Sequence, residues 1–511
     1  MPSARTRAAV ELLLALFALA LCWADVCWAL RPGLFPVFDE INNQTLFLAG
    51  SYRQFFHFFP DSFYANRPLG WAFIRLLFDL FRFDYTRQVA CLLAIHFGNC
   101  GLAFLLFRRL GVSVPLSIAG VGLFGSLSTT AQTATYIGAS FDVICLFFLL
   151  ASTLALLWER GGESRPGREA DSARTAAHSP ELGQCSDICR GLLSAVLFLA
   201  ALRTKEFAIF TPLPLTVLLA LRLPRLPLGR ALAALARRLW MHYLILLAFG
   251  LRYLSLFPGY RTAITPDNPY YMDLHAATAL KSLAWYTALV FGADESRWQL
   301  PPLLLALLLA ALLCWAIFRR RAGIAFGVCA FVLTLQPVCL MPNQRWPFYA
   351  YAPQLFLILV LCLLAGEALA SLGKRERLRW VVAVCIALAC FSWCVAFRRR
   401  AYFRDRVNLT LAFRRTCLRT ARDVDAQLPP LGPGTHVYVN HRRDTRPWLF
   451  LVGPCSYLRL MNRQRGIDCV WDLPTGRLRG LYAADRGEKY FVDYHDDGSI
   501  TVTAGTRRQP R

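Results

Sequence analysis

The chain has 511 residues, of which 56% are hydrophobic and 17% are charged, and its formal net charge is +24. Soluble globular domains carry about 25% charged residues, so this composition excludes a soluble enzyme, a disordered chain and a small disulfide scaffold. A basic balance also suits nucleic-acid binding. In so apolar a chain, however, the cations are expected to mark one face of a membrane.

Eleven apolar stretches are candidates for membrane-spanning helices. A bilayer core about 30 Å thick needs about 20 apolar residues per helix, and the third and fifth stretches are the shortest. An odd number of spans places the two ends of the chain on opposite sides of the membrane. The stretches lie near residues 9–30, 87–107, 113–128, 139–158, 189–203, 207–222, 239–257, 299–318, 322–341, 351–372 and 379–397.

Basic residues predict the orientation, because cytoplasmic loops carry an excess of Lys and Arg. The basic segments that fall on one side are Arg5 and Arg7, Arg108 and Arg109, and the runs within 222–238, 319–321 and 374–379. The N-terminus is then cytoplasmic and the C-terminus is exported, to the periplasm in a bacterium or to the ER lumen in a eukaryote. The first span also has signal-peptide features, with Cys22 and Ala24 suited to cleavage, but its apolar run continues to Leu30, which favours a retained helix.

The composition divides the chain into a membrane domain, residues 1–397, and an exported C-terminal domain, residues 398–511. Residues 159–189 are polar and poor in aromatics, which indicates a disordered cytoplasmic linker. After residue 398 an Arg-rich amphipathic stretch at about 399–427 precedes the strand-like runs THVYVN, WLFLVG, KYFVDY and SITVTA, the last two of which suit a hairpin. The predicted fold is an all-α polytopic membrane protein with a small C-terminal α+β domain.

The 17 cysteines show no spacing typical of a zinc site. Most lie in apolar stretches, where a thiol behaves as a small hydrophobic group. Cys185 and Cys189 are four residues apart in the polar linker, which is weak support for a metal. Cys455 and Cys469 are candidates for a disulfide if the C-terminal domain is exported.

The first exported loop, residues 31–86, is too long for a simple connection. Its segment 71–83 has apolar residues at helical spacing with charges between them, which predicts a helix lying in the membrane interface. Asp39 and Glu40 follow the first span. Two interpretations fit this acidic pair: a general base that takes a proton from a hydroxyl, or a helix cap or ion pair with Arg67.

Two further charged clusters interrupt apolar sequence. In ALRTKEFAIF, Arg203, Lys205 and Glu206 either form a functional site or mark a short loop. In PNQRWPFYAYAP, Arg345 stands alone among aromatic residues. A guanidinium suits phosphate; the alternative is an aromatic belt with one snorkelling cation.

Three polar residues lie within the predicted spans. His96 and Asn99, in the segment HFGN, predict a hydrogen bond between helices. Asp142 begins the fourth span, and it is expected either to support a site or to pair with an arginine of the exported side.

These segments occur in an order that resembles the GT-C glycosyltransferases. The resemblance is greatest to bacterial family-39-like enzymes and to the membrane O-mannosyltransferases that carry TPR repeats, and it covers roughly residues 1–370. The matching segments are the acidic pair DE, then NRPLGW, HFGN, TATYIGASFDVI, LRTKEFAIF and RWPFYAYAP. They correspond to the family's acidic first loop, RPL element, HxxN, GRADLL-like segment, KE loop and R…YxYxP loop.

The resemblance implies an inverting glycosyltransferase that moves a sugar from a polyprenyl-phosphate carrier to an acceptor hydroxyl on the exported face. Fixed cations stabilise a leaving phosphate, so no metal or other cofactor is expected. The expected partners are the lipid-linked donor, an envelope glycan, lipid-linked saccharide or protein as acceptor, and membrane lipids, but no nucleic acid. The implied site residues are Asp39 as base with Glu40 beside it, Lys205, Arg345 and Arg67 for the donor phosphate, and Glu206, Asp142 and Tyr349 in support.

The chain departs from the family pattern in places. Ala139 and Ser140 stand where Arg and Ala are expected, and GSLSTTAQTATY lacks the preceding His-Pro element. No TPR repeats follow the spans, so a protein acceptor does not carry over from the mannosyltransferases.

A multispan transporter or flippase of a lipid-linked saccharide is the alternative function. The long first loop with its acidic pair favours the enzyme, whereas internal repeats, which are not visible, would favour the transporter. A structural membrane protein with a C-terminal binding domain would leave the ordered charged clusters unexplained.

Overall fold

The computed structural model describes residues 52–56, 67–157, 180–223, 226–261, 271–291, 301–371, 406–441, 467–471, 489–494 and 499–504, with isolated positions between 378 and 462. The chain forms two compact units. The first contains residues 59–70 and 92–399 with the N-terminal residues 1–24, and the second contains residues 25–58, 71–91 and 400–511. The last segment of the second unit begins at residue 400, and the predicted boundary was 398. The second unit also contains residues 71–91, which are the end of the predicted first loop and the start of the predicted span near 87–107.

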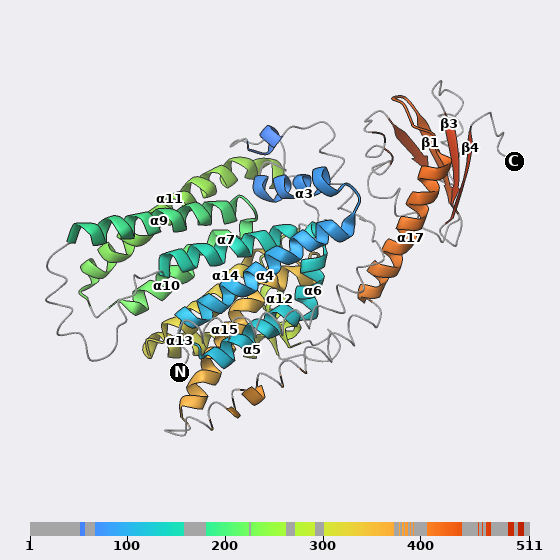
Figure 1. The fold of residues 1–511 in the computed structure, drawn as a ribbon. Coiled ribbons are helices and arrows are strands. Elements are labelled where there is room, and N and C mark those ends of the chain that lie inside the picture. Colours follow the sequence, from blue (N-terminus) through green and yellow to red (C-terminus); the bar gives the residue numbers. More distant parts are fainter. Residues whose placement is uncertain are drawn as a thin grey trace. The chain divides into compact units, whose positions relative to one another are not determined.

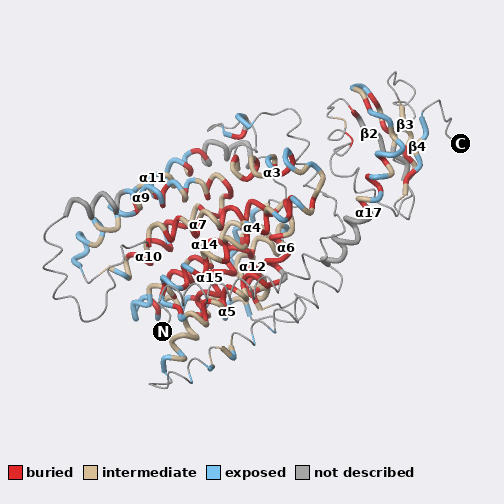
Figure 2. Tube along the Cα trace, in the orientation of Figure 1, coloured by how far each residue is buried: buried red, intermediate tan, exposed pale blue. Residues whose placement is uncertain are grey.

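The first unit is built from helices that lie side by side (Figure 1). Helix α7 packs against α9, α9 packs against α11, and α14 packs against both α15 and α10. Buried residues run along α7, α14 and α15 (Figure 2). Two helices, α3 (Pro68–Phe81) and α4 (Tyr85–Arg109), have residues in both units. The other elements of this unit are α5 (Val114–Ser126), α6 (Ser128–Thr135), η4 (Ile137–Ala139), α7 (Ser140–Leu157), α9 (Pro180–Leu202), η6 (Glu206–Phe210), α10 (Pro212–Arg222), α11 (Leu228–Arg261), α12 (Ala276–Val290), α13 (Pro302–Phe318), α14 (Ala322–Cys339), η7 (Pro347–Ala350) and α15 (Tyr351–Ala370).

Five helices among the described residues are long and apolar enough to cross a membrane, or six if the bent pair α5–α6 is one span. They match the predicted spans near 87–107, 139–158, 239–257, 322–341 and 351–372. Two shorter apolar helices, Cys189–Leu202 and Pro302–Phe318, match two more. The predicted span near 9–30 lies outside the described residues. The chain is therefore a helical, polytopic membrane protein.

Three local predictions differ from the structure. The stretch 207–222 is a 3-10 turn, η6, followed by the 11-residue helix α10, because Pro212 begins a new helix at Thr211–Pro212. Helix α9 begins at Pro180, inside the predicted linker 159–189, and Pro and Glu at its first positions suit a helix start. Helix α12 was not predicted from the connection 258–298; it packs against α13, α14 and η7.

The second unit holds a four-stranded sheet in the order β2-β1-β3-β4. Strands β3 (Lys489–Tyr494) and β4 (Ile500–Ala504) pair in antiparallel, as the predicted hairpin requires. Strand β1 (His436–His441) matches THVYVN and pairs in parallel with β3. It also pairs in parallel with β2 (Asp468–Trp471), a strand that was not predicted. The run WLFLVG and Cys455 lie outside the described residues, so the predicted Cys455–Cys469 disulfide remains a prediction, as does a metal at Cys185 and Cys189.

One apolar core joins the elements of the second unit. Helix α17 (Arg406–Gln427), within the predicted amphipathic stretch, contributes Cys417, Ala421 and Val424 at helical spacing. Val437, Val492 and Ile500 of the sheet belong to the same core, and so does Phe78 of α3. The segment predicted to lie in the membrane interface is thus helical over Pro68–Phe81, but Phe78 on its apolar face packs in a protein core.

Candidate functional site

The segment that joins α9 to η6 brings distant parts of the first unit together. The backbone N–H of Leu69 donates to the carbonyl oxygen of Arg203 at 3.2 Å, which places the RPL element beside the KE loop. The Lys205 backbone N–H donates to the Ala201 carbonyl at 2.9 Å and closes the last turn of α9. Lys205 itself has extended backbone, which ends the helix and directs the following residues into η6. The predicted short loop therefore exists, and it also carries charged side chains that have specific partners.

Lys205 and Asp142 form a buried ion pair. The Lys205 Nζ donates to Asp142 Oδ2 at 2.5 Å, and the two side chains are 9% and 4% exposed. Asp142 lies in the first turn of α7, where a carboxylate suits the helix dipole. The Cys145 thiol donates to the Ala201 carbonyl at 3.4 Å and ties α7 to α9 one turn further along. The sequence suggested an arginine of the exported side as a structural partner for Asp142; the partner in the structure is a lysine, Lys205.

Arg67 and Glu206 form a second, two-point ion pair beside the first. The Arg67 Nε lies 2.7 Å from Glu206 Oε1, and its NH2 group lies 2.7 Å from Oε2. The guanidinium also lies 5.5 Å from the centre of the Phe141 ring, which is consistent with a cation–π contact. The glycine at Gly70 permits this arrangement, because a Cβ there would overlap the Phe141 ring. We call Arg67, Asp142, Lys205 and Glu206 the charged cluster.

The charges of the cluster act on one another through low-dielectric surroundings. Burial by itself raises the pKa of Glu206, but the positive charge and hydrogen bonds of Arg67 overcome it, so that the pKa lies below its usual value of 4.5. Glu206 is thus held ionised. It is a partner of Arg67 that the sequence did not suggest, since Asp39 and Glu40 were the expected partners.

Aromatic rings from η7 cover the charged cluster. Lys205 Nζ lies 4.6 Å from the centre of the Tyr349 ring and 5.9 Å from that of Phe348. Tyr136, just before η4, packs with Phe348 at 6.1 Å between ring centres. The segments RWPFYAYAP and TATYIGASFDVI therefore meet beside Lys205.

Arg345 lies in the segment between α14 and η7, near the cluster. Its positive charge acts on Tyr286 of α12, and the negative charge of Asp142 acts on the same tyrosine. The Arg345 Nε and the Tyr286 hydroxyl are both buried, and neither has a hydrogen-bond partner among the described residues. A buried donor without a partner is costly, so this part of the site has capacity for a polar ligand. Tyr286 was not predicted, because α12 itself was not.

Arg203 and Arg252 are a second pair of interacting cations, and only Arg203 was singled out in the sequence. Arg252 in α11 is 2% exposed, and its positive charge acts on Arg203, which is partly buried at the end of α9. One terminal nitrogen of Arg203 is buried without a hydrogen-bond partner among the described residues. Arg252 was detectable in the sequence as a single cation inside an apolar span, which is a functional candidate by default.

His96, Asn99 and Tyr351 form the hydrogen-bond network between helices that the segment HFGN predicts. The Tyr351 hydroxyl lies 2.7 Å from His96 Nδ1, and Asn99 Nδ2 donates to it at 3.1 Å and to the Val143 carbonyl at 2.8 Å. All three side chains are buried. Because Tyr351 follows η7 directly, this network fixes the segment that carries Tyr349.

The predicted base is not placed by the structure. Asp39 and Glu40 lie outside the described residues, so their role stays a prediction. At Ala139 and Ser140, where the chain differs from the family pattern, the backbone continues from η4 into α7, and Asp142 contacts Lys205. Within the described ranges, no group of three or more His, Cys, Asp or Glu side chains is arranged to hold a metal ion.

Neither a protein-family model nor a curated protein matches the chain. Two solved structures are similar over most of its length. ArnT from Cupriavidus metallidurans in the apo state shares 12% identity, with 97% of this chain and 94% of that chain covered and a TM-score of 0.49. The oligosaccharyltransferase of Archaeoglobus fulgidus in the apo form shares 10% identity, with 95% and 69% covered and a TM-score of 0.46.

Both of these proteins are GT-C fold glycosyltransferases. A likeness of this size assigns no activity to the chain. The chain is a polytopic helical membrane protein that is similar to solved structures of the GT-C fold.

Proposed function

We propose that this protein is a membrane glycosyltransferase of the GT-C class that takes a sugar from a polyprenyl-phosphate carrier and transfers it to an acceptor hydroxyl. The observation that carries the proposal is the buried Lys205–Asp142 pair, with the Arg67–Glu206 pair beside it. Arg345 precedes Tyr349, whose ring contacts Lys205, by four residues. Charges at this burial are rare unless they are paired, and ionisable groups that interrupt membrane segments are functional candidates by default. They come from the segments that match the family's site motifs in the sequence.

The chemistry suits a phosphate leaving group. As the bond from the anomeric carbon to the phosphate oxygen breaks, negative charge develops on the phosphate, and preorganised cations stabilise that charge more than the ground state. Lys205 has three N–H donors and uses one for Asp142, so its ammonium group retains donors for a phosphate oxygen. Arg345 supplies a buried Nε–H that the described residues leave without an acceptor.

The carboxylates would have different roles. Asp142 and Glu206 position Lys205 and Arg67, because each holds its cation at a fixed place. We assign the base to Asp39: it takes the proton from the acceptor hydroxyl while the acceptor oxygen attacks the anomeric carbon from the side opposite the phosphate. The new glycosidic bond then has the inverted configuration. No step requires a metal ion or another cofactor.

The location of the reaction follows from the predicted orientation. The charged cluster lies at the end of the first unit that contains the N-terminal ends of α7 and α15, which the distribution of basic residues predicts to be exported. The acceptor is an envelope glycan, a lipid-linked saccharide or a protein. A lipid carrier would reach this end from the surrounding bilayer.

The test uses the full-length protein in lipid nanodiscs with a panel of polyprenyl-phosphate sugars. We expect Lys205→Ala and Arg345→Ala to weaken donor binding at least about tenfold, which corresponds to about 1.4 kcal/mol. Asp39→Asn is expected to retain donor binding and lose transfer. Lys281→Ala, which removes an exposed lysine of α12, is the matched control and should bind the donor as the wild type does.

Two outcomes would contradict the proposal. Unchanged donor affinity in both Lys205→Ala and Arg345→Ala would remove the phosphate site. Movement of an intact lipid-linked saccharide across the bilayer, with no cleavage of the phosphate–sugar bond, would show the alternative function, a flippase.

A further inference from the structure

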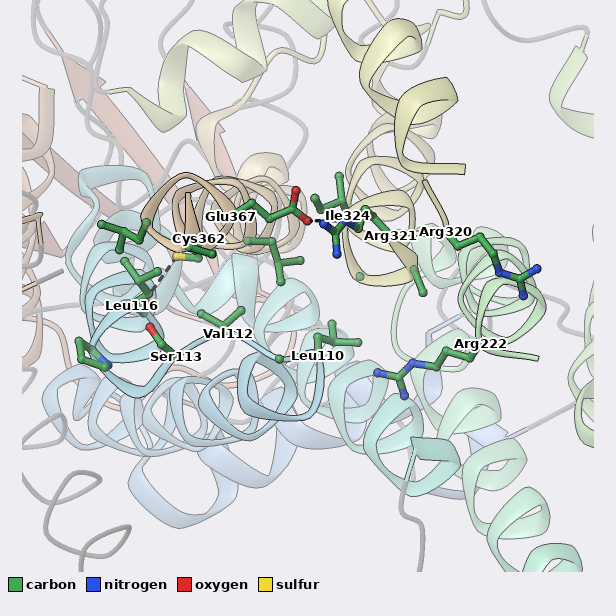
Figure 3. Close-up of a pocket in the computed structure, with 18 residues that line it drawn as sticks. Leu110, Val112, Ser113, Leu116, Arg222, Arg320, Arg321, Ile324, Cys362 and Glu367 are labelled. Atoms are coloured by element: carbon green, nitrogen blue, oxygen red, sulfur yellow. Dashed lines mark hydrogen bonds and ion pairs between the residues drawn. The ribbon is translucent and has the colours of Figure 1, made fainter. Parts of the chain in front are cut away.

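A cavity of about 760 Å³ lies at the other end of the first unit (Figure 3). Helix α15 begins at Tyr351, beside η7 and the charged cluster, and ends at Ala370, which lines the cavity. Its 20 residues extend about 30 Å at about 1.5 Å per residue. Helix α14 runs the opposite way, from Ala322 at the cavity to Cys339 near Arg345. The cavity is therefore separate from the proposed transfer site.

The walls of the cavity are of two kinds. Leu116 of α5 and Cys362 of α15 lie on one side, and the Cys362 thiol donates to the Leu116 carbonyl at 3.4 Å (Figure 3). Arg222, Arg320 and Arg321 lie toward the other side, at the ends of α10 and α14 (Figure 3). Among the described residues that line the cavity, Glu367 is the one acidic side chain. The space thus combines an apolar surface with a surplus of positive charge.

The arginine side chains are held in place by the ends of neighbouring helices. Arg222 donates to the Arg109 carbonyl at 3.0 Å, and Arg320 donates to the Leu221 carbonyl at 3.1 Å and also to that of Leu223. The Arg321 Nε lies 2.9 Å from Glu367 Oε1. A guanidinium carries five N–H donors, so these bonds fix Arg320 and Arg321 and leave donors for an anion. Three of the basic segments that predict the cytoplasmic side therefore meet here.

The backbone at Arg320 is in a conformation that side chains rarely adopt. Its φ is 53°, in the left-handed region, and among the described residues only Arg82 is another non-glycine residue with positive φ. Glycine would occupy this position without strain. The positive φ belongs to the end of α13, where the Arg321 N–H donates to the Ala316 carbonyl at 2.7 Å and the Arg320 N–H donates to the Ile317 carbonyl at 3.0 Å.

We propose that this cavity binds the phosphate headgroup of an anionic phospholipid. The guanidinium groups would hold the phosphate oxygens through charge-assisted hydrogen bonds, and the apolar wall would contact the start of the acyl chains. The positive-inside rule predicts that this end faces the cytoplasmic leaflet, where anionic lipids attract basic groups. The site is independent of the glycosyl-transfer proposal, because it shares no residue with it.

The experiment titrates delipidated full-length protein in detergent with phosphatidylglycerol or phosphatidylcholine, and native mass spectrometry counts bound lipid. We expect phosphatidylglycerol to bind preferentially and Arg320→Gly to weaken its binding about tenfold. The glycine relieves the backbone strain, so the variant should remain folded. Arg321→Gln is a second variant with the same expected loss. Arg319→Gln is the matched control, because Arg319 is adjacent and exposed but does not line the cavity.

A parallel arm adds inorganic phosphate and follows the thermal unfolding temperature. Stabilisation by phosphatidylglycerol that inorganic phosphate does not reproduce supports a lipid ligand. Equal stabilisation by both would overturn the lipid assignment in favour of a soluble phosphate. Unchanged phosphatidylglycerol binding in Arg320→Gly and Arg321→Gln, or an equal loss in Arg319→Gln, would overturn the site.

Discussion

Lys205 Nζ lies 2.5 Å from Asp142 Oδ2, although the two residues are 63 positions apart in the chain. The contact joins the segment after α9 to the first turn of α7. Both side chains are almost fully buried. A buried ion pair contributes little net stability, but the loss of one partner leaves a desolvated charge.

The first prediction follows from this pair. Lys205→Met leaves the Asp142 carboxylate buried without its cation, and Asp142→Asn leaves the ammonium without its anion, so each change should lower the free energy of unfolding by about 3–5 kcal/mol. The double variant should be clearly more stable than the sum of the two single changes implies. Thermal or denaturant unfolding of the detergent-solubilised protein measures both effects.

The exposed pair Arg87–Asp84 is the control for the variants of the buried pair. Its side chains are 71% and 40% exposed, so Asp84→Asn should cost no more than about 1 kcal/mol. Additive effects of Lys205→Met and Asp142→Asn would show that the two residues do not act as a pair.

The second prediction concerns the Tyr351 hydroxyl. Tyr351→Phe removes the group that bonds to His96 and Asn99 and leaves both polar side chains buried without that partner. We expect a loss of about 1–3 kcal/mol in unfolding free energy. Tyr243→Phe removes an exposed hydroxyl that bonds to Thr216 and should be nearly neutral. Equal unfolding temperatures for the two variants would argue against a structural role for the network.

The third prediction is a pH dependence at Glu206. The pKa of Glu206 is lowered in the folded protein, so its contribution to stability is fully present above 4.5, its usual value, and is lost as the pH falls through the lower folded value. Glu206→Gln should remove this part of the acid destabilisation and give a flatter stability profile below about pH 4.5.

Unfolding temperatures of wild type and Glu206→Gln between pH 7 and pH 3 provide the measurement. The variant should be the less stable of the two at pH 7, because Arg67 then lacks its carboxylate, and the difference should shrink on acidification. A difference that stays constant across this range would contradict the pairing of Arg67 with Glu206.

The fourth prediction concerns the glycine next to the RPL element. A Cβ at Gly70 would overlap the Phe141 ring, which lies under the Arg67 guanidinium, so Gly70→Ala should cost about 1–3 kcal/mol and weaken donor binding. Gly101 in α4 has no atom within 4 Å of the position a Cβ would take. Gly101→Ala should therefore be neutral or stabilise the helix by up to about 1 kcal/mol. Similar unfolding temperatures for both variants would refute the packing argument.

Local hydropathy was enough to predict the class of the protein and most of its helices. The helices α4, α7, α14 and α15 end within a few residues of their predicted spans, because membrane insertion depends on local hydropathy over about 20 residues. The hydrogen bond between the HFGN segment and another helix was also predictable, since buried polar side chains need partners. The hairpin β3–β4 followed from its turn residues and alternating pattern.

Which charges form pairs depends on the packing of the helices. The chain has 32 acidic residues, and nothing local in the sequence selects Asp142 for Lys205 or Glu206 for Arg67. The partner of a buried charge depends on how helices distant in the chain pack. For the same reason α12 with Tyr286 and the basic cavity at Arg320 were not predicted, whereas Arg252 was detectable in the sequence as a lone cation in an apolar span. Hydropathy places a helix in the membrane, but the packing of helices against one another places a side chain in a site.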